Sequence, residues 1–356
     1  MQTIKTALCS YGMSGWVFHA PFLNLHQGFE LYGVWERSKK TAAEKYPAIK
    51  SFDTYEALLN DAAIELVIVN TPNYTHFDFA KQALLAGKHI IVEKPFCVTV
   101  AECEELISLA KEKNKLLSVY QNRRYDSDYK IIKKVIGEDW LGDIVEAEFH
   151  FDRFSEVLSP KGHKETPGPG TGLLYDLGSH LIDQVLQLFG MPDAIFADIR
   201  AARKISLVDD YMELLLYYPS KRVRIKSSYV VREPLPSYVF HGTKGSFIKA
   251  RTDVQEKALQ AGETPDKDDW GSEPENEMGL LHTEKDGKII REYIPSTNGN
   301  YMEYYDGIYQ SLTTGAALPV TAEDGKKVIQ IIEKAYQSSK EKKVISISRK
   351  KQSGVL

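Results

Sequence analysis

Asp176 and His180 stand four residues apart in the stretch "GLLYDLGSHLIDQ" (172–184) and could together transfer a proton. On a helix, residues i and i+4 project from one face. A histidine held beside a carboxylate is a common general base. The same pattern also fits a helix that Asp176 caps and in which His180 is a hydrogen-bonded core residue. The spacing therefore identifies a candidate base and leaves this structural interpretation open.

A lysine in "VEKPF" (92–96) could stabilise negative charge on a substrate oxygen. Glu93 and Lys94 end a strongly apolar run, and Pro95 fixes the backbone that follows. A cation at the end of a buried strand can reach into a crevice and polarise an oxygen. The alternative is an ordinary pair of surface charges.

The turn "SYGMSG" (10–15) follows a short apolar run and could bind a pyrophosphate. Backbone N–H groups at the start of the next helix attract phosphate. Gly12 would let the phosphate approach the backbone, and Gly15 would let helix and strand pack closely. Because Ser10 replaces the first glycine of G-x-G-x-x-G, a plain tight turn is the alternative. The expected cofactor contacts here are Gly12, Met13, Ser14, Gly15 and Trp16.

An acidic residue follows the second apolar run, where dinucleotide-binding folds hold the ribose. Glu36 suits the ribose hydroxyls of NAD, whereas the neighbouring Arg37 and Ser38 suit the 2′-phosphate of NADP. A solvated helix start capped by Ser38 is the structural alternative. We therefore expect NADP or NAD as the cofactor, with NADP favoured.

A third polar turn, "VNTPNYTH" (69–76), ends another apolar run. The carboxyl edge of a parallel sheet is where ligands bind in open α/β folds. The sequence therefore predicts further cofactor contacts at this edge, although a loop that only caps the next helix is the alternative. The residues concerned are Thr71, Pro72, Asn73 and His76, together with Glu93, Lys94 and Asn122.

The elements that must position these residues change in character near residue 122. Apolar runs before it alternate with helical patterns, which indicates βαβ units and a parallel sheet covered on both faces. The runs are 3–9, 29–35, 64–69, 88–92 and 115–120, and the helical patterns are 54–60, 75–86 and 99–113. We therefore predict an α/β fold with a doubly wound Rossmann domain at residues 1–121.

Later runs alternate polar and apolar residues, as in an antiparallel sheet with one wetter face. These runs are 144–152, 210–218, 222–231 and 236–241. The pattern also predicts a helix at 175–189, a surface loop at 251–277 and terminal helices at 300–314 and 322–340. Residues 122–349 are therefore predicted to form an α+β domain with a large, mostly antiparallel sheet that binds substrate and mediates oligomerisation.

Composition excludes several classes of protein. The 356 residues are 43% hydrophobic and 26% charged, with a net charge of −4, so nothing favours nucleic acid as a partner. Three cysteines lack metal-ligand spacing and a disulfide framework, which favours a reducing compartment and no metal site. No apolar run is long enough for a membrane span or a signal peptide. We expect a soluble cytoplasmic protein that does not bind membranes.

Taken together and in order, the motifs resemble those of the Gfo/Idh/MocA family of NAD(P)-dependent oxidoreductases. They are "YGMSGWVFHAPF", "VIVNTPNYTHF", "AGKHIIVEKPF" and "GLLYDLGSHLIDQ". The similarity continues through "QNRRYDSDY", "FHFDRF" and "ALPVTAEDGKKVI" and so covers nearly the whole chain. Within the family it is most similar to the NADP-dependent scyllo-inositol dehydrogenases.

The resemblance implies a hydride transfer between a nicotinamide cofactor and the CH–OH group of a polyol or sugar. The family's Glu-Lys-Pro motif falls on Glu93, Lys94 and Pro95, and its Asp-x-x-x-His motif on Asp176 and His180. His180 would then accept the alcohol proton, Lys94 would stabilise charge on the oxygen, and Asp176 would hold a hydroxyl or orient His180. The expected substrate contacts are Lys94, Arg124, Tyr125, Arg153, Asp176 and His180.

The resemblance also implies a homo-oligomer, a dimer or tetramer, formed through the face of the C-terminal sheet. The chain departs from the family at residues 155–166, within "SEVLSPKGHKETPGPG", where close relatives often carry a Trp-Arg pair. That segment should border the substrate, so it bears on substrate preference. Two other functions remain open: action on another class of alcohol or carbonyl, and a dinucleotide-binding sensor without turnover.

Overall fold

The computed structural model describes residues 3–36 and 40–347, which divide into two compact units. Unit 1 comprises Met1–Lys130, Asp253–Glu273 and Thr297–Ile329. Unit 2 comprises Ile131–Thr252, Pro274–Ser296 and Gln330–Leu356. Each unit is built around its own sheet.

Unit 1 contains a six-stranded parallel sheet in the order β3-β2-β1-β4-β5-β6. This is the strand order of a dinucleotide-binding Rossmann fold, so the predicted fold is confirmed. The strands are β1 (Ile4–Leu8), β2 (Phe29–Trp35), β3 (Lys50–Phe52), β4 (Leu66–Val69), β5 (His89–Glu93) and β6 (Leu117–Tyr120). All four residues of β4 and of β6 are buried, as expected for strands covered on both faces.

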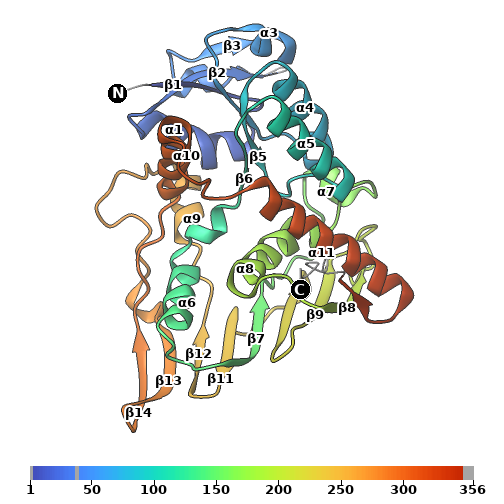
Figure 1. Cartoon of the computed structure of the whole chain (residues 1–356), viewed down its shortest axis with the longest axis vertical. Helices are drawn as coiled ribbons and strands as arrows, with labels where there is room; N and C mark the ends of the chain where they lie inside the picture. The colour runs from blue at the N-terminus through green and yellow to red at the C-terminus, as the bar shows by residue number, and fades with distance from the viewer. Residues whose placement is uncertain (1–2, 37–39, 348–356) are drawn as a thin grey trace, which may run out of the picture. The chain divides into compact units, whose positions relative to one another are not determined.

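Helices connect these strands and cover the sheet. They are η1 (Gly15–His19), α1 (Ala20–Leu25), α2 (Ala42–Lys45), α3 (Tyr55–Asn60), η2 (Asn73–Thr75), α4 (His76–Leu85), α5 (Val100–Glu112) and η3 (Asn122–Tyr125). Thr99 and Glu102 form a reciprocal capping box at the start of α5, which satisfies two backbone donors there. Figure 1 shows α4 and α5 side by side, and residues of the two helices are in contact.

Three later helices contribute to unit 1, wholly or in part: α9 (Val254–Gln260), α10 (Met302–Thr314) and the first turns of α11 (Ala322–Glu341). Unit 1 therefore contains residues 122–130, 253–273 and 297–329 in addition to the predicted domain at 1–121. Tyr304 of α10 lies 2.8 Å from the Ser118 hydroxyl of β6, and Tyr305 stacks on Phe22 at 5.6 Å between ring centroids. These buried contacts bind late segments to the first sheet.

The predicted surface loop at 251–277 is wrong for its first part, because it contains α9. Gln255 and Leu259, four residues apart, are the buried residues of this helix. Gln255 accepts hydrogen bonds from Trp270 and from the backbone of Tyr301, and it donates to the backbone carbonyl of Tyr125. The acidic, Gly- and Pro-rich composition around α9 concealed this short amphipathic turn.

Unit 2 contains a nine-stranded sheet in the order β14-β13-β12-β11-β7-β10-β9-β8-β15. Its strands pair antiparallel except for β7 with β10, which confirms the predicted mostly antiparallel sheet. The strands are β7 (Ile144–His150), β8 (Ala194–Arg200), β9 (Tyr211–Tyr217), β10 (Arg222–Ser228), β11 (Tyr238–Gly242), β12 (Gly245–Lys249), β13 (Gly279–Lys285), β14 (Lys288–Ile294) and β15 (Ile345–Ser346). The sequence patterns missed β8 and β12 to β15.

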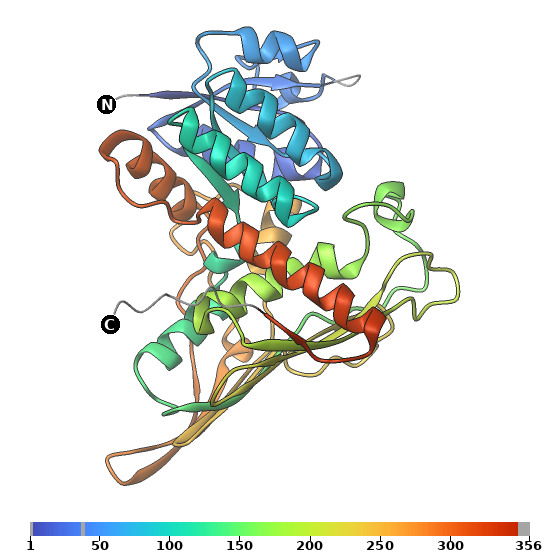
Figure 2. The same ribbon diagram turned by 45° about the vertical axis from the view of Figure 1, so that its right-hand side comes forward.

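The described helical segments of unit 2 are most of α6 (Ser127–Gly137), α7 (Gly162–Glu165), η4 (Leu174–Gly178), α8 (Ser179–Phe189), η5 (Glu275–Glu277) and the part of α11 from Gln330 onward. Helix α8 packs on one face of the sheet and contacts β10 (Figure 2). Leu181, Ile182 and Val185 of α8 are fully buried in this layer. Within the described residues, no helix lies over the opposite face of the sheet in Figure 2.

In residues 3–36 and 40–347, no helix combines the length and the apolar character that a membrane span requires.

Candidate active site

The glycine turn lies at the carboxyl end of β1 and is tied to β4. The Asn70 side chain donates to the carbonyl of Ser10 at 2.8 Å, and the Ser10 hydroxyl accepts from the Gly12 N–H at 3.0 Å. A Cβ atom at Gly15 would stand 2.4 Å from the Ser10 carbonyl oxygen, so only glycine fits there. Ser10 thus replaces the first glycine while its side chain closes the turn.

This turn fits a pyrophosphate. Gly12 is exposed, and among the described residues a Cβ atom there would have one neighbour within 4 Å, the Ser10 hydroxyl at 3.3 Å. Met13, Ser14 and Trp16 are half-buried around it, at the start of η1. Backbone approach at a helix N-terminus is the geometry that a dinucleotide phosphate requires. Gly15 allows the turn to pack closely, and Gly12 could leave room for a phosphate.

Glu36 follows β2 directly, as predicted, and its carboxylate is engaged by the protein. It accepts from the Thr41 N–H at 3.0 Å, the Thr41 hydroxyl at 3.2 Å and the Ala42 N–H at 3.3 Å. These groups begin α2, and Glu36 is buried beneath them. Arg37 and Ser38 lie outside the described residues, so the proposed Ser38 cap is not described either.

The turn after β4 is connected to the turn after β5 by His76. Its Nδ1 lies 2.9 Å from the Pro95 carbonyl oxygen, and its Nε2 lies 2.9 Å from the Thr71 carbonyl oxygen. Burial lowers the pKa of His76, although both carbonyls oppose the shift. Pro72 precedes η2, which begins at Asn73, and the Thr71 hydroxyl before this turn lies 2.7 Å from the Thr75 hydroxyl at its end. His76 thus fixes the turn after β4 and the turn after β5, two segments predicted to bind the cofactor, relative to each other.

Glu93 contacts three other residues of unit 1. Its buried carboxylate accepts from the Ser14 hydroxyl at 2.5 Å and the Lys94 N–H at 3.0 Å, and it lies 3.0 Å from Nε2 of His19. Burial alone would raise the pKa of Glu93, but the hydrogen bonds and charge of His19, Ser14 and Lys94 lower it. The ionised carboxylate of Glu93 therefore connects the glycine turn to the backbone of Lys94.

We expect loss of the His19 partner to destabilise the protein strongly. His19→Phe removes one of the three partners of the buried Glu93 carboxylate, and a hydrogen bond to a charged group is worth about 1.5–3 kcal/mol. Tyr305, whose hydroxyl lies 2.7 Å from the other ring nitrogen of His19, offers the control Tyr305→Phe, with an expected cost of about 1 kcal/mol. Denaturant unfolding measures both costs. Equal values for the two variants would contradict the role given to Glu93.

The sign of the pH effect follows from the lowered pKa of Glu93. A carboxyl group with a lower pKa in the folded state stabilises the protein above its unfolded pKa. This stabilisation is lost as the pH falls through the folded pKa. The difference in unfolding free energy between the wild type and His19→Phe should therefore shrink in acid.

The predicted residues after β6 make contacts within unit 1, where Asn122 and Arg124 are buried and Tyr125 is half-buried. Asn122, Arg123 and Arg124 begin η3, and all three are buried. Arg124 lies 3.6 Å from the Asp324 carboxylate, and the carbonyl of Tyr125 accepts from the backbone of Asn300. Arg123, which was not a predicted site residue, pairs with Asp126, Asp253 and Glu256.

In unit 2, Asp176 lies in η4 and His180 in the first turn of α8, which continues η4 without a break. Asp176 is not the helix cap, because Leu173 precedes the helical turn and the Asp176 N–H donates to the Gly172 carbonyl. The Asp176 side chain is 21% exposed, whereas His180 is buried. The structural alternative for Asp176 is therefore wrong, and its carboxylate remains accessible.

Lys164 is a residue at this site that the sequence patterns missed. Its Nζ donates to Oδ2 of Asp176 at 2.6 Å. Burial and then the charge of Asp176 raise the pKa of Tyr229 to about 12. Arg153 is exposed after β7, with its guanidinium 5.0 Å from the centre of the Phe151 ring. No motif marks Lys164, which lies in the segment that we expected to depart from the family.

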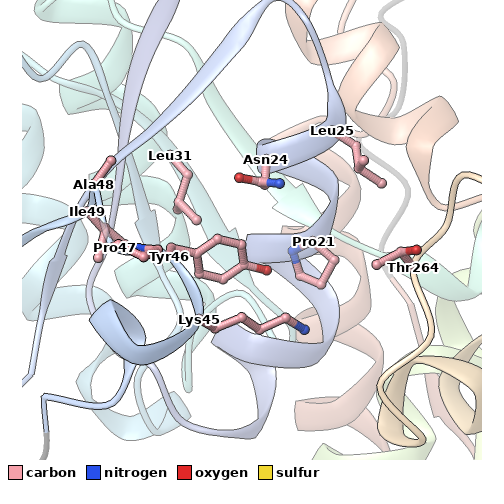
Figure 3. A pocket seen from close by; sticks show the side chains of 10 residues that line it. All are labelled: Pro21, Asn24, Leu25, Leu31, Lys45, Tyr46, Pro47, Ala48, Ile49 and Thr264. Atoms are coloured by element: carbon pink, nitrogen blue, oxygen red, sulfur yellow. The ribbon is translucent and has the colours of Figure 1, made fainter.

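A pocket of about 350 Å³ lies elsewhere in unit 1 (Figure 3). Residues of α1, β2 and the α2–β3 connection line it, together with Thr264. They are Pro21, Asn24, Leu25, Leu31, Lys45, Tyr46, Pro47, Ala48 and Ile49. None of these belongs to the predicted site.

Comparisons with known families agree with the two folds. Residues 4–121 match the GFO_IDH_MocA description "Oxidoreductase family, NAD-binding Rossmann fold". Residues 133–347 match the description "Oxidoreductase family, C-terminal alpha/beta domain".

The chain is also similar to individual proteins over nearly its whole length. It is 42% identical over 347 residues to scyllo-inositol 2-dehydrogenase (NADP(+)) IolW of Bacillus subtilis, covering 98% of this chain and 97% of that protein. A solved structure from Bacteroides fragilis has a TM-score of 0.90 and 45% identity, covering 97% of this chain and 100% of the other. The solved structure of YvaA from Bacillus subtilis has a TM-score of 0.93 and 41% identity, covering 98% and 99%.

Proposed function

The chain belongs to the Gfo/Idh/MocA family of oxidoreductases, and on that basis we propose that it is an NADP-dependent dehydrogenase of a polyol or sugar. The observation that carries the proposal is the Glu93 carboxylate, which binds both Ser14 of the glycine turn and the backbone of Lys94. The turn that we propose as the phosphate site and the half-buried Lys94 are thus bound to the same buried carboxylate. The NADP-dependent inositol dehydrogenase among the relatives supports the cofactor and the substrate class.

Each of three residues would have a separate part in the oxidation of an alcohol. The nicotinamide, when bound, accepts the hydride. His180 takes the proton from the hydroxyl oxygen, and Lys94 stabilises the negative charge that develops on that oxygen. Asp176 accepts a hydrogen bond from a substrate hydroxyl. We propose these roles for one reaction, with Arg124, Tyr125 and Arg153 as further substrate contacts.

The preference for NADP is supported by the engagement of Glu36. A residue in this position serves NAD by accepting hydrogen bonds from the ribose hydroxyls. Here the carboxylate already accepts from Thr41 and from the Ala42 backbone. It is therefore turned toward α2, which leaves Arg37 and Ser38 to bind a 2′-phosphate.

Arg37→Ala should weaken NADP binding about 10- to 100-fold and change NAD binding little. Charge-assisted hydrogen bonds to a phosphate are worth about 1.5–3 kcal/mol, and each 1.4 kcal/mol corresponds to a factor of ten. Calorimetric titration with both cofactors measures the effect, and Lys81→Ala on α4 serves as the control. Equal losses for NADP and NAD would contradict the assignment.

Gly12→Val should abolish cofactor binding without destabilising the protein, because its side chain enters the space assigned to the phosphate. Gly15→Ala should instead destabilise the fold, since its Cβ would stand 2.4 Å from the Ser10 carbonyl oxygen. Titration followed by the fluorescence of the neighbouring Trp16 separates the two effects, together with thermal unfolding. An unchanged titration of Gly12→Val would rule out the turn as the phosphate site.

A panel of inositols and aldoses, assayed with NADP and NAD in parallel, tests the proposed function. We expect oxidation of at least one polyol, with NADP preferred. Tight cofactor binding with every polyol and sugar inert would instead favour the dinucleotide-binding sensor.

We also propose that the chain forms a dimer or tetramer through the face of the nine-stranded sheet that carries no helix. One row of side chains crosses eight neighbouring strands on this face, and all of them are at least partly exposed. In spatial order the row is Phe196, Leu215, Arg224, Glu148, Val239, Ile248, Leu280 and Tyr293. An exposed row so rich in apolar groups is typical of an interface. Light scattering of the purified protein measures the mass, and a monomer would refute this proposal.

A further inference from the structure

The segment that departs from the family, residues 155–166, is built into unit 2 by one buried arginine. Arg203 donates through Nη1 to the carbonyls of Val157 at 2.8 Å and Ser155 at 3.3 Å. Its Nε donates to Asp210 at 2.7 Å, and its Nη2 lies 3.7 Å from Glu165. A guanidinium that makes several directed bonds fixes the path of a segment that has little regular structure.

The same segment carries a second anchor at α7. The Glu165 carboxylate accepts from the Ser159 N–H at 2.7 Å, which closes the six residues before it into a compact loop. Lys164, one residue earlier, projects onto Asp176 at 2.6 Å. The contacts of Arg203 and Glu165 thus hold the segment in which the Lys164 ammonium group lies beside the Asp176 carboxylate.

The Lys164–Asp176 pair is accessible. The lysine side chain is 36% exposed and the aspartate 21%, so a ligand can reach both groups. An ammonium group has three N–H donors, and a carboxylate has two acceptor oxygens. Side by side, the pair offers a donor and an acceptor to one hydroxyl group, whose oxygen accepts from Lys164 while its hydrogen is donated to Asp176.

We propose that Lys164 is a specificity-determining residue that, together with Asp176, binds the hydroxyl next to the one that is oxidised. This inference rests on the proposed function, in which His180 takes the proton of the reacting hydroxyl. Asp176 lies one helical turn from His180, so the pair takes a neighbouring oxygen of the substrate. The substrate class is therefore a vicinal diol. Residues 155–166, through Lys164, recognise the hydroxyl beside the one that is oxidised.

The test compares an inositol with its monodeoxy analogue, which lacks a hydroxyl beside the reacting carbon. The inositol with the highest kcat/KM in the panel is used. The wild type should prefer the inositol about 10- to 100-fold, as expected for a charge-assisted hydrogen bond. Lys164→Met and Lys164→Gln should lower this preference about tenfold, mainly through kcat/KM for the inositol. Lys164→Arg should restore part of it.

Lys204→Met, which removes an exposed lysine next to Arg203, is the matched control and should keep the full preference. Thermal unfolding confirms that each variant is folded. If the Lys164 variants lose activity equally on both compounds, or lose none, Lys164 forms only a surface ion pair and the inference is refuted, while the proposed dehydrogenase stands. If the wild type oxidises no polyol, the proposed function fails and the inference falls with it.

Discussion

Lys94→Ala should lower kcat about 10²- to 10³-fold while changing the dissociation constant of NADP little. The reason is that the ammonium group stabilises charge that exists on the substrate oxygen only in the transition state, and such donors typically contribute this much. The backbone of Lys94 would still donate to Glu93, so the glycine turn and its phosphate contacts should persist. Steady-state kinetics and calorimetric titration measure the two quantities separately.

Lys81→Ala is the matched control for this variant. Lys81 lies on α4 of the same unit, and its side chain is 40% exposed and pairs with Glu105. It should leave both kcat and NADP binding unchanged. A Lys94→Ala variant that keeps near-normal turnover, or that loses NADP binding in proportion to kcat, would contradict an electrostatic role for Lys94.

His180→Ala should lower kcat about 10²- to 10⁴-fold, the usual range for the loss of a general base. It should also remove the acidic limb of the pH–rate profile, because a protonated imidazole cannot accept the alcohol proton. His282→Gln, an exposed histidine on β13, is the control and should keep the wild-type profile. A His180→Ala variant with an unchanged acidic limb would show that another group is the base.

Asp176→Asn tests whether His180 or Asp176 is the base whose protonation produces the acidic limb of the pH–rate profile. The amide keeps the shape of the side chain but loses the charge that pairs with Lys164. We expect a smaller loss of kcat than for His180→Ala, with the acidic limb retained. A larger loss, with the limb abolished, would transfer the role of the base to Asp176.

Long, strongly apolar or strongly alternating segments made the two folds predictable from the sequence. The five predicted strands of the first sheet are present, because each is a buried run between helical patterns. Two short elements were not predicted. Strand β3 has three residues, too few to show a period, and α9 lies in a stretch whose composition is typical of a loop. The return of α10 to the first sheet depends on contacts such as Ser118 with Tyr304, which are 186 residues apart.

The candidate site was predictable where one local motif carries the chemistry. The glycine turn, the Glu-Lys-Pro turn and the Asp-x-x-x-His helix each lie within a few residues of sequence. The partners that hold them do not. His19 is 74 residues from Glu93, and Arg203, which holds the segment of Lys164, is 46 residues from its acceptor Val157. Such tertiary contacts leave no periodic signal in the chain.

The most direct test of the proposed dehydrogenase is the rate at which the purified protein forms NADPH from NADP and each inositol of the panel, measured for the wild type, Lys94→Ala and His180→Ala. We expect turnover by the wild type and at least a hundredfold loss in each variant, with NADP binding retained. Turnover that survives in both variants, or no turnover of any polyol by a wild type that binds NADP, would contradict the account.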